Sequence, residues 1–257
     1  MSEFRTAVSV VEPGRVLIRG YSQAEIIGKL PYADATFLTI FGRLPSASEA
    51  RLTDAMLTSL LDHGWVASTV TAARYIASGN PQFIPAVAGG ILAAGQNTLS
   101  PEHSFKLIEE VIAFQATSAL SMNQAARAVV AEMLKAKQRI PGLGHPVHRS
   151  GDFRSTVLFD LADELGLSGE SVKVYRELRT ATFEISGRDL PINIDACLAC
   201  LGRDLGWSAN QVIAIAVLAV LPGLMAHVIE EIDARVPLRY IRDGEYVGAV
   251  YRPLDTM

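Results

Sequence analysis

The sequence lacks the features that mark several common classes of protein. It has two cysteines, Cys197 and Cys200, and both lie in the apolar run CLAC, which excludes a disulfide framework. We interpret them as small buried side chains in a cytoplasmic protein, although the spacing also permits a redox pair. The formal net charge is −4, so no basic surface for nucleic acid is expected. The N-terminal residues contain no apolar stretch of the kind found in secretory signals, so no such signal is expected.

Internal repeats and long polar tracts are also missing, which argues against a repeat fold and against disorder. Hydrophobic residues instead make up 49% of the 257 residues, enough to bury a large core. The longest apolar run, 212–229, approaches the length of a membrane span. Because Pro222, Gly223 and His227 interrupt it, we expect a buried core helix and no membrane partner.

Helical periodicity dominates the chain and predicts an all-α fold with short β pieces near the termini. The expected helices cover residues 22–38 with a break at Pro31, 46–61, 69–77, 84–94, 101–137 as one or two helices, 155–165, 170–185, 194–205 and 208–233. Alternating Val, Ile and Tyr around turn residues predict strands or hairpins over 6–18 and 239–252.

One stretch, 141–154, concentrates residues that are suited to chemistry. Its sequence PGLGHPVHRSGDFR places two histidines and two arginines among glycines and prolines. Glycines let a backbone approach a ligand closely, and a loop can bring titratable groups to that ligand. His145 would then act as general acid or base, while Arg149 and Arg154 would hold anionic groups. An ordinary interhelical turn explains the same residues, and a metal site needs more ligands than two histidines supply.

Two further segments have both a structural and a functional interpretation. The sequence DHGWVAST at 62–69 reads as a helix end followed by the capping residue of the next helix. Asp195, in PINID, begins an apolar helix, where a negative charge is favourable. A carboxyl among Ile, Leu and Cys is also typical of a base with a raised pKa. The residues alone leave these alternatives open.

These three segments, taken in order with four others, resemble the citrate synthase superfamily. The matching stretches are TAVSVVEPGRVLIRGY, FLTIFGRLPS, DHGWVAST, PGLGHPVHRSGDFR, NIDACLACLGRDLG, LPGLMAHVIEE and YIRDGEYVG, and they extend over nearly the whole chain. The closer likeness is to the short citryl-CoA lyases and to the citrate-synthase-like module of ATP-citrate lyase. It implies a multi-helical fold with a large domain, about 1–137 and 190–257, and a smaller subdomain, about 138–189.

The resemblance implies a role for each residue that matches a family motif. His145 contacts the hydroxyl or carbonyl oxygen of the substrate and helps to remove the hydroxyl proton during cleavage. Arg154 and His63 bind the four-carbon acid, and Asp195 moves the proton on the methyl carbon of acetyl-CoA. Arg242, or alternatively Arg239, reaches into the site of a neighbouring subunit, so a homo-oligomer of at least two subunits is expected.

The loop before His145 carries the remaining implied contacts. Gly142, Leu143 and Gly144 match the segment whose backbone contacts coenzyme A, and Arg149 stands where relatives have a basic residue. The expected ligands are therefore a coenzyme A thioester and a keto acid, with no metal required.

Two positions depart from the family pattern. Citrate synthases have a histidine in an HGGA motif after the Ala/Gly-rich helix, and Thr98 stands near that position here. His103, five residues later, reads as a surface residue at a helix entry, although it could swing into the site. The module of ATP-citrate lyase also lacks this histidine, so the departure favours a lyase over a synthase.

The second departure is Val220, which stands where relatives have an arginine ahead of the AHxxE motif. A buried carboxylate that loses its partner cation costs about 2–5 kcal/mol. Either another cation substitutes, with Arg188 and Arg203 as candidates, or the substrate is less polar at this point.

The sequence thus predicts a carbon–carbon lyase that cleaves citryl-CoA, or a related 3-hydroxyacyl-CoA, to acetyl-CoA and oxaloacetate or a related 2-oxo acid. Condensation of acetyl-CoA with a 2-oxo acid, as in citrate synthase, is an alternative, because the same residues serve both directions. A non-catalytic subunit that binds coenzyme A is another alternative. The presence of His63, His145, Arg154 and Asp195 together argues against it, because a subunit without catalysis would not need all four.

Overall fold

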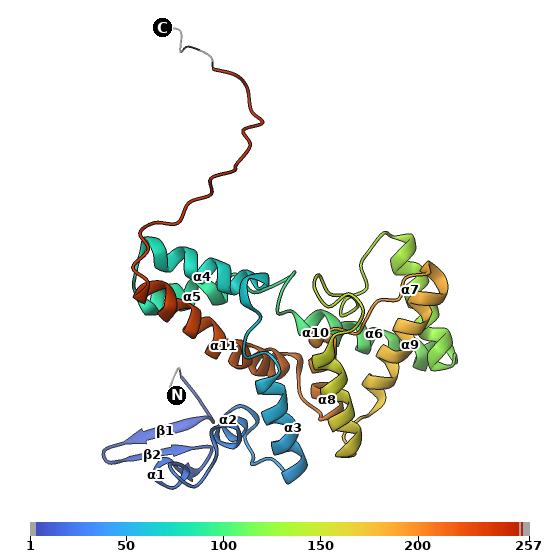
Figure 1. Ribbon diagram of the computed structural model, residues 1–257. Helices are drawn as coiled ribbons and strands as arrows, with labels where there is room; N and C mark the ends of the chain where they lie inside the picture. The colour runs from blue at the N-terminus through green and yellow to red at the C-terminus, as the bar shows by residue number, and fades with distance from the viewer. Residues whose placement is uncertain (1–3, 252, 254–257) are drawn as a thin grey trace.

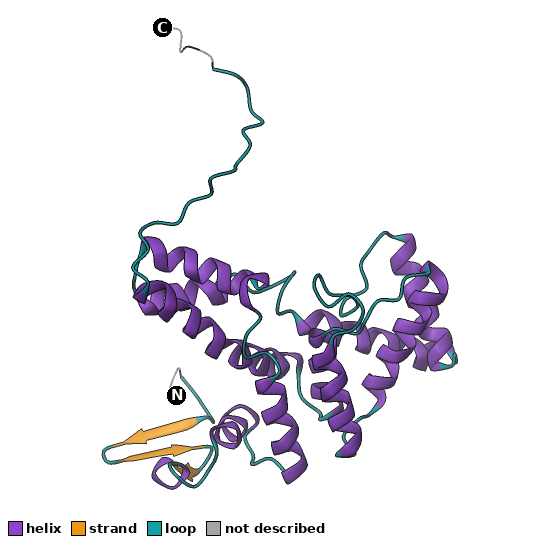
Figure 2. Ribbon diagram, viewed as in Figure 1, coloured by secondary structure: helices purple, strands orange, loops and turns teal. Residues whose placement is uncertain are grey.

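The computed structural model describes residues 4–251 and 253, which form a helical molecule with one small sheet near the N-terminus (Figures 1 and 2). The strands β1 (Ser9–Glu12), β2 (Arg15–Ile18) and β3 (Tyr21–Ser22) pair antiparallel in the order β1-β2-β3. The expected N-terminal hairpin is confirmed. The expected C-terminal one is wrong, because residues 239–251 form no strand; Arg252 lies outside the described residues.

Eleven α-helices make up most of the described chain, which confirms the all-α class. They are α1 (Gln23–Ile26), α2 (Tyr32–Phe41), α3 (Ala47–Thr58), α4 (Ser68–Gly79), α5 (Phe83–Leu92), α6 (Pro101–Ser118), α7 (Met122–Lys135), α8 (Phe153–Glu164), α9 (Glu170–Ser186), α10 (Ile194–Asp204) and α11 (Ala209–Asp233). A 3₁₀ turn, η1 (Gly64–Val66), lies between α3 and α4.

Local sequence explains where several helices begin and end. Ser46 and Glu49 form the capping box expected at the start of α3, in which each side chain accepts a backbone N–H of the other residue. Pro31 precedes α2, and Gly42 ends it in the left-handed conformation that glycine adopts without steric cost. These residues divide the chain into short helices. Such helices are stabilised mainly by packing of their apolar faces against one another.

Helix α11 lies in the middle of the molecule, between α4 and α5 on one side and α3, α6 and α10 on the other (Figure 1). Among the described helices it alone is long and apolar enough to cross a membrane by length and composition, a test that a core helix also passes. Its packing agrees with the predicted core helix. Only 33% of its most apolar stretch is fully buried, so part of the helix also faces outward.

The largest hydrophobic core surrounds α10, in which the residues from Ala196 to Leu201 have no exposed surface. Cys197 and Cys200 belong to this run and are free thiols, which confirms their interpretation as small buried side chains. A second, smaller core fills the space between α4, α5 and α11. The division into a large domain and a subdomain over 138–189 stays a prediction.

Candidate active site

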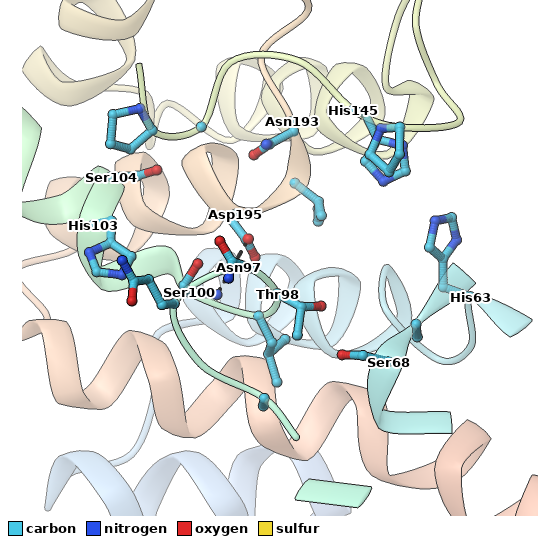
Figure 3. Close-up of a pocket in the computed structure, with 18 of the residues that line it drawn as sticks. His63, Ser68, Asn97, Thr98, Ser100, His103, Ser104, His145, Asn193 and Asp195 are labelled. Atoms are coloured by element: carbon cyan, nitrogen blue, oxygen red, sulfur yellow. Dashed lines mark hydrogen bonds between the residues drawn. The ribbon is translucent and has the colours of Figure 1, made fainter. Parts of the chain in front are cut away.

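Residues from distant parts of the chain line one cleft of about 920 Å³. Its walls come from the turn at η1, the start of α4, the loop 93–100, the loop 139–146, the start of α10 and the middle of α11. Of the residues singled out in the sequence, the cleft is lined by His63, Thr98, His103, Gly142, Leu143, Gly144, His145, Arg154, Asp195 and Val220. Figure 3 shows Asp195 between two groups of side chains, with His63 and His145 on one side and His103 on the other.

The glycine loop is fastened to the start of α10. Gly142 has φ +73°, and a Cβ there would lie 2.4 Å from Cβ of Ala196, so only glycine fits. The backbone N–H of Asn193 donates to the Gly142 carbonyl at 2.9 Å, and its side-chain amide donates to the Gly144 carbonyl at 3.0 Å. The sequence analysis did not identify Asn193 as a site residue. It is the capping residue of α10, and its position directly ahead of an apolar helix is typical of that role.

Arg154 is buried, with 7% of its surface exposed, because Asp152 pairs with it. Nε and Nη2 of the guanidinium donate to the two carboxylate oxygens at 2.8 Å each, and the backbone N–H of Ile194 donates to one of them at 3.0 Å. Burial works to raise the pKa of Asp152, but Arg154 outweighs it and holds that pKa below its usual value. The sequence analysis did not identify Asp152 as a site residue. Its position as the capping residue of α8 is the sequence feature that could have indicated it.

Three histidine rings gather at one end of the cleft. The ring centres of His63 and His145 are 5.1 Å apart, and His148 stacks on His145 at 4.6 Å. Nδ1 of His145 accepts the backbone N–H groups of Val147 and His148 at 3.1 and 3.0 Å. Burial, helped by the charge of Arg154, lowers the pKa of His145 to about 4. The ring is therefore neutral near pH 7 and carries its hydrogen on Nε2.

Some side-chain nitrogens of this cluster lack a hydrogen-bond partner. Nε2 of His145 lies 3.4 Å from Nη2 of Arg154, and both atoms are donors, so neither satisfies the other. Nε2 of His63 is buried and has no hydrogen-bond partner in the described part of the chain. Burial, with Arg154 as the second cause, lowers the pKa of His63. The pocket thus offers N–H donors and a free ring nitrogen where an oxygen-rich ligand would fit.

The same three histidines are the candidate ligands for a metal ion among the described residues. One nitrogen each from His63, His145 and His148 lie within 4.8 Å of one another. Two backbone N–H groups already occupy Nδ1 of His145, which leaves Nε2 as the nitrogen of that ring for a metal ion. The guanidinium of Arg154 already lies against His145, and a bound cation there would meet its charge. The cluster as it stands does not fit a metal ion well.

Asp195 lies in the first turn of α10 and is partly buried. Burial raises the pKa of its carboxyl, although the backbone N–H of Ser100 donates to it at 3.4 Å. Thr98 and Gly95 exchange backbone hydrogen bonds and form the turn that carries Thr98 into the cleft. The expectation that His103 is a surface residue is wrong in part, because its side chain is partly exposed but lines the cleft (Figure 3).

Several sequence candidates lie outside the cleft lining. Arg149 is exposed on the outer side of the loop. Arg242 is exposed in the C-terminal segment, which runs away from the helices in Figure 1, with its guanidinium 5.4 Å from the ring centre of Tyr240. Arg239 instead donates to Glu231 of its own chain, with Nη2 to oxygen at 2.9 Å. Of these two arginines, Arg239 is thus held by an ion pair within its own chain, and no ion pair holds Arg242 in the described part of the chain.

The proposed replacements for a cation at Val220 are wrong. Arg203 donates to the hydroxyl of Ser171 at 3.1 Å on the far side of α10, and it does not line the cleft. Arg188 is exposed beyond the end of α9 and does not line it either. Neither guanidinium is available to a ligand beside Val220.

A helical fold in which a glycine loop is fastened to a helix whose first turn holds a partly buried aspartate has the architecture of citrate synthase. The chain belongs to the citrate synthase family, because the family model "Citrate synthase, C-terminal domain" matches residues 17–243.

Individual relatives show how far the likeness extends. Citrate synthase 2 of Bacillus subtilis is 28% identical over 224 residues, which is 84% of this chain and 56% of that protein. Citrate synthase of Synechocystis is 27% identical over 231 residues, 88% of this chain and 52% of that protein. The chain thus spans about half the length of these curated relatives.

Among solved structures, citryl-CoA lyase from Hydrogenobacter thermophilus superposes with a TM-score of 0.87 and 31% identity, covering 99% of this chain and 98% of that one. ATP citrate lyase from Methanothrix soehngenii, solved with citrate and coenzyme A, matches with a TM-score of 0.79 and 19% identity, covering 97% of this chain and 42% of that one. The second likeness shows the fold alone.

Proposed function

We propose that the protein is a carbon–carbon lyase that cleaves a 3-carboxy-3-hydroxyacyl-CoA, citryl-CoA or a related thioester, into acetyl-CoA and a 2-oxo acid. The observation that carries the proposal is that His145, Arg154 and Asp195 line one cleft beside the glycine loop. The end-to-end likeness to a citryl-CoA lyase supports the lyase over the synthase. Thr98, in place of a histidine, supports it as well.

Binding begins with the carboxylate on C3 of the substrate. Arg154 has five N–H donors, and Asp152 uses two of them. The remaining donors, with Nε2–H of His145, hold the C3 carboxylate and hydroxyl oxygen in a fixed orientation. The backbone of Gly142–Gly144 lies along the thioester arm, where the absence of side chains allows close approach.

Cleavage then breaks the bond between C2 and C3. The hydroxyl proton leaves to the histidine pair, where the unpartnered Nε2 of His63 accepts it. The C3 oxygen becomes a ketone oxygen as the C2–C3 electron pair moves into the thioester and forms an enolate. Nε2–H of His145 stabilises the negative charge on the C3 oxygen by hydrogen bonding. This donor role replaces the base role that the sequence assigns to His145, because Nδ1 is occupied by backbone N–H groups.

Asp195 completes the reaction. Its raised pKa keeps a larger fraction of the carboxyl protonated near neutral pH, and the acid delivers this proton to C2 of the enolate to form the methyl group of acetyl-CoA. Because every step is reversible, the same residues would catalyse condensation. The 27–28% identity to citrate synthases favours that second candidate.

We also propose that two or more copies of the chain assemble. Exposed apolar side chains gather on α4, α5 and α11: Tyr75, Ile76, Phe83, Ile84, Leu92 and Ile229. Ile84 is 77% exposed and Leu92 85%, and exposed apolar patches on packed helices are typical of protein–protein interfaces. A second copy seated there would cover them, and the C-terminal segment could carry Arg242 to the neighbouring cleft.

Incubation with citryl-CoA and related 3-carboxy-3-hydroxyacyl-CoA thioesters, followed by mass spectrometry, tests the proposal. A lyase yields acetyl-CoA and a 2-oxo acid in equal amounts. Release of free coenzyme A from acetyl-CoA and a 2-oxo acid, seen with a thiol reagent, would instead identify a synthase. If the protein binds coenzyme A but catalyses neither cleavage nor condensation, both enzyme proposals fail and a non-catalytic subunit remains.

A further inference from the structure

The cleft holds little positive charge for a ligand with two carboxylates. In the described part of the chain the charged basic residues that line it are Arg139 and Arg154. Asp152 already neutralises Arg154 through two hydrogen bonds, which leaves donors for one further carboxylate. Arg139 is exposed ahead of the glycine loop, on the thioester side of the proposed binding mode. The end of the cleft near the histidines thus has one guanidinium.

The wall of the cleft near His63 is mostly apolar and offers no cation. Its apolar side chains are Leu60, Val66, Ala67, Ala93, Ala94 and Val220. The polar ones beside them, Ser68 and Thr69, are uncharged, and the Ser68 hydroxyl donates to the Ala93 carbonyl at 3.3 Å. Contact between α11 and the segment before His63 places Val220 in this wall. A Cβ on Gly223, one turn after Val220, would lie 2.1 Å from the carbonyl oxygen of Leu61, so the two backbones touch.

This wall sets a preference for the group that occupies it. A carboxylate placed against it would lose its hydration and find no cation among the described lining residues of its own subunit, whereas an alkyl group would bury apolar surface. An unpaired buried charge is disfavoured by a factor of about 30 or more relative to a paired one. A methyl or longer alkyl group suits this wall, and a carboxymethyl group does not.

We infer that the preferred substrate has one free carboxylate, on the carbon that bears the hydroxyl, and an alkyl group in place of a second carboxylate arm. This inference rests on the proposed function and names its substrate class. The reaction is R–C(OH)(COO⁻)–CH₂–CO–SCoA giving R–CO–COO⁻ and CH₃–CO–SCoA, where R is alkyl. The hydroxyl loses its proton, the C2–C3 bond breaks, C2 gains a proton from Asp195, and the thioester stays intact.

The test compares two thioesters that differ only at R. The first is 3-carboxy-3-hydroxybutanoyl-CoA, whose product pyruvate is measured with lactate dehydrogenase and NADH. The second is citryl-CoA, whose product oxaloacetate is measured with malate dehydrogenase and NADH. Each is supplied as the mixture of C3 epimers, so that stereochemistry does not decide the outcome. The wild-type protein should show kcat/KM about 30-fold or more higher for the methyl compound.

Two variants test the wall itself. Val220→Arg should shift the ratio toward citryl-CoA by about tenfold or more, because it adds the missing cation. Val220→Leu is the matched control and should keep the preference for the methyl compound. Thermal unfolding establishes whether each variant is folded, and the wild-type ratio decides the inference even if Val220→Arg does not fold.

The outcomes separate the inference from the proposed function. Equal or faster cleavage of citryl-CoA by the wild-type protein overturns the inference and leaves the lyase proposal standing. If Arg242→Ala then removes that activity, the neighbouring subunit supplies the second cation, which also overturns the inference. Failure to form acetyl-CoA from any such thioester overturns the proposed function instead.

Discussion

Nη2 of Arg154 lies 3.4 Å from Nε2 of His145, with both atoms in the role of donor. The orientation follows from the backbone, since two N–H groups of the loop occupy Nδ1 of the histidine and place its hydrogen on Nε2. Two donors that face each other in a partly buried site gain most from an anionic oxygen placed between them. This pair is therefore the physical basis for assigning carboxylate and alkoxide binding to this end of the cleft.

The ionisation of His145 should lower stability in mild acid. Its pKa is about 4 in the folded protein against 6.5 ordinarily, so between these values the unfolded chain binds a proton that the folded chain does not. The free energy of unfolding should fall as the pH falls through that window. His145→Gln removes this contribution, and its melting temperature should drop less than that of the wild type between pH 7 and pH 5. Parallel losses in both proteins would contradict the assignment.

Asp195 should control the chemical step. Asp195→Asn keeps the size of the side chain but cannot transfer a proton, and should lower kcat by about 10²–10⁴-fold, while Asp160→Asn on an exposed face should not. Because the pKa is raised and cleavage needs the protonated acid, kcat for cleavage should fall as the pH rises through that pKa. Condensation needs the carboxylate and should show the opposite slope. A pH profile that is unchanged in Asp195→Asn would refute the role.

The glycine loop should tolerate no side chain at Gly142. Gly142→Ala adds a Cβ that meets Ala196 at 2.4 Å and places alanine at φ +73°. Gly166→Ala is the control, with a similar φ of +68° and nothing within 4 Å of its Cβ. The control should cost about 1 kcal/mol in the free energy of unfolding, from backbone conformation alone. Gly142→Ala should cost at least about 1 kcal/mol more, measured by urea unfolding, and weaken thioester binding.

Activity should not depend on a divalent metal. Protein dialysed against EDTA should keep its full kcat, because no step assigned to His63, His145 or Asp195 uses a metal ion. His148→Gln removes the third histidine of the cluster and should leave the response to EDTA unchanged. A loss of activity that zinc restores in the wild type but not in His148→Gln would instead show a metal centre built from the three rings.

The exposed apolar surface of α4, α5 and α11 should mediate self-association. Ile84→Asp places a charge in that surface and should shift the protein toward monomers in light scattering coupled to gel filtration. Val157→Asp, on α8 and 60% exposed in the wild type, is a matched control that should not change the mass. Loss of activity together with loss of the dimer would fit Arg242 acting across subunits. A monomeric wild-type protein with full activity would exclude that role.

Helix positions and caps were predictable because they depend on neighbours in sequence. The capping box of Ser46 and Glu49 and the breaks at Pro31 and Gly42 are examples, each set by backbone groups within a few residues. The C-terminal hairpin over 239–252 failed for the opposite reason. Alternating apolar residues predict a strand only when a partner strand exists, and residues 239–251 have none in the described chain.

The site could be predicted only as a set of candidates. Gly142 and His145 were identifiable from glycines, prolines and histidines in one loop, but Asn193 and Asp152 were not, since they act by fastening other groups. His103 was placed at the surface because a helix entry is usually exposed, and the cleft reaches it only through the packing of α6 against α10.

By itself the sequence determined the helical class, the family likeness and the residue types available for chemistry, because these depend on composition, order and local spacing. Tertiary structure alone decided which groups share one environment. Burial beside Arg154 lowers the pKa of His145 and leaves its ring neutral near pH 7, and burial at the start of α10 raises the pKa of Asp195. Contact between α11 and the segment before His63 brings Val220 to the cleft lining. Charge and solvation depend on neighbours that are distant in sequence, which is why the substrate preference is inferred from the folded chain.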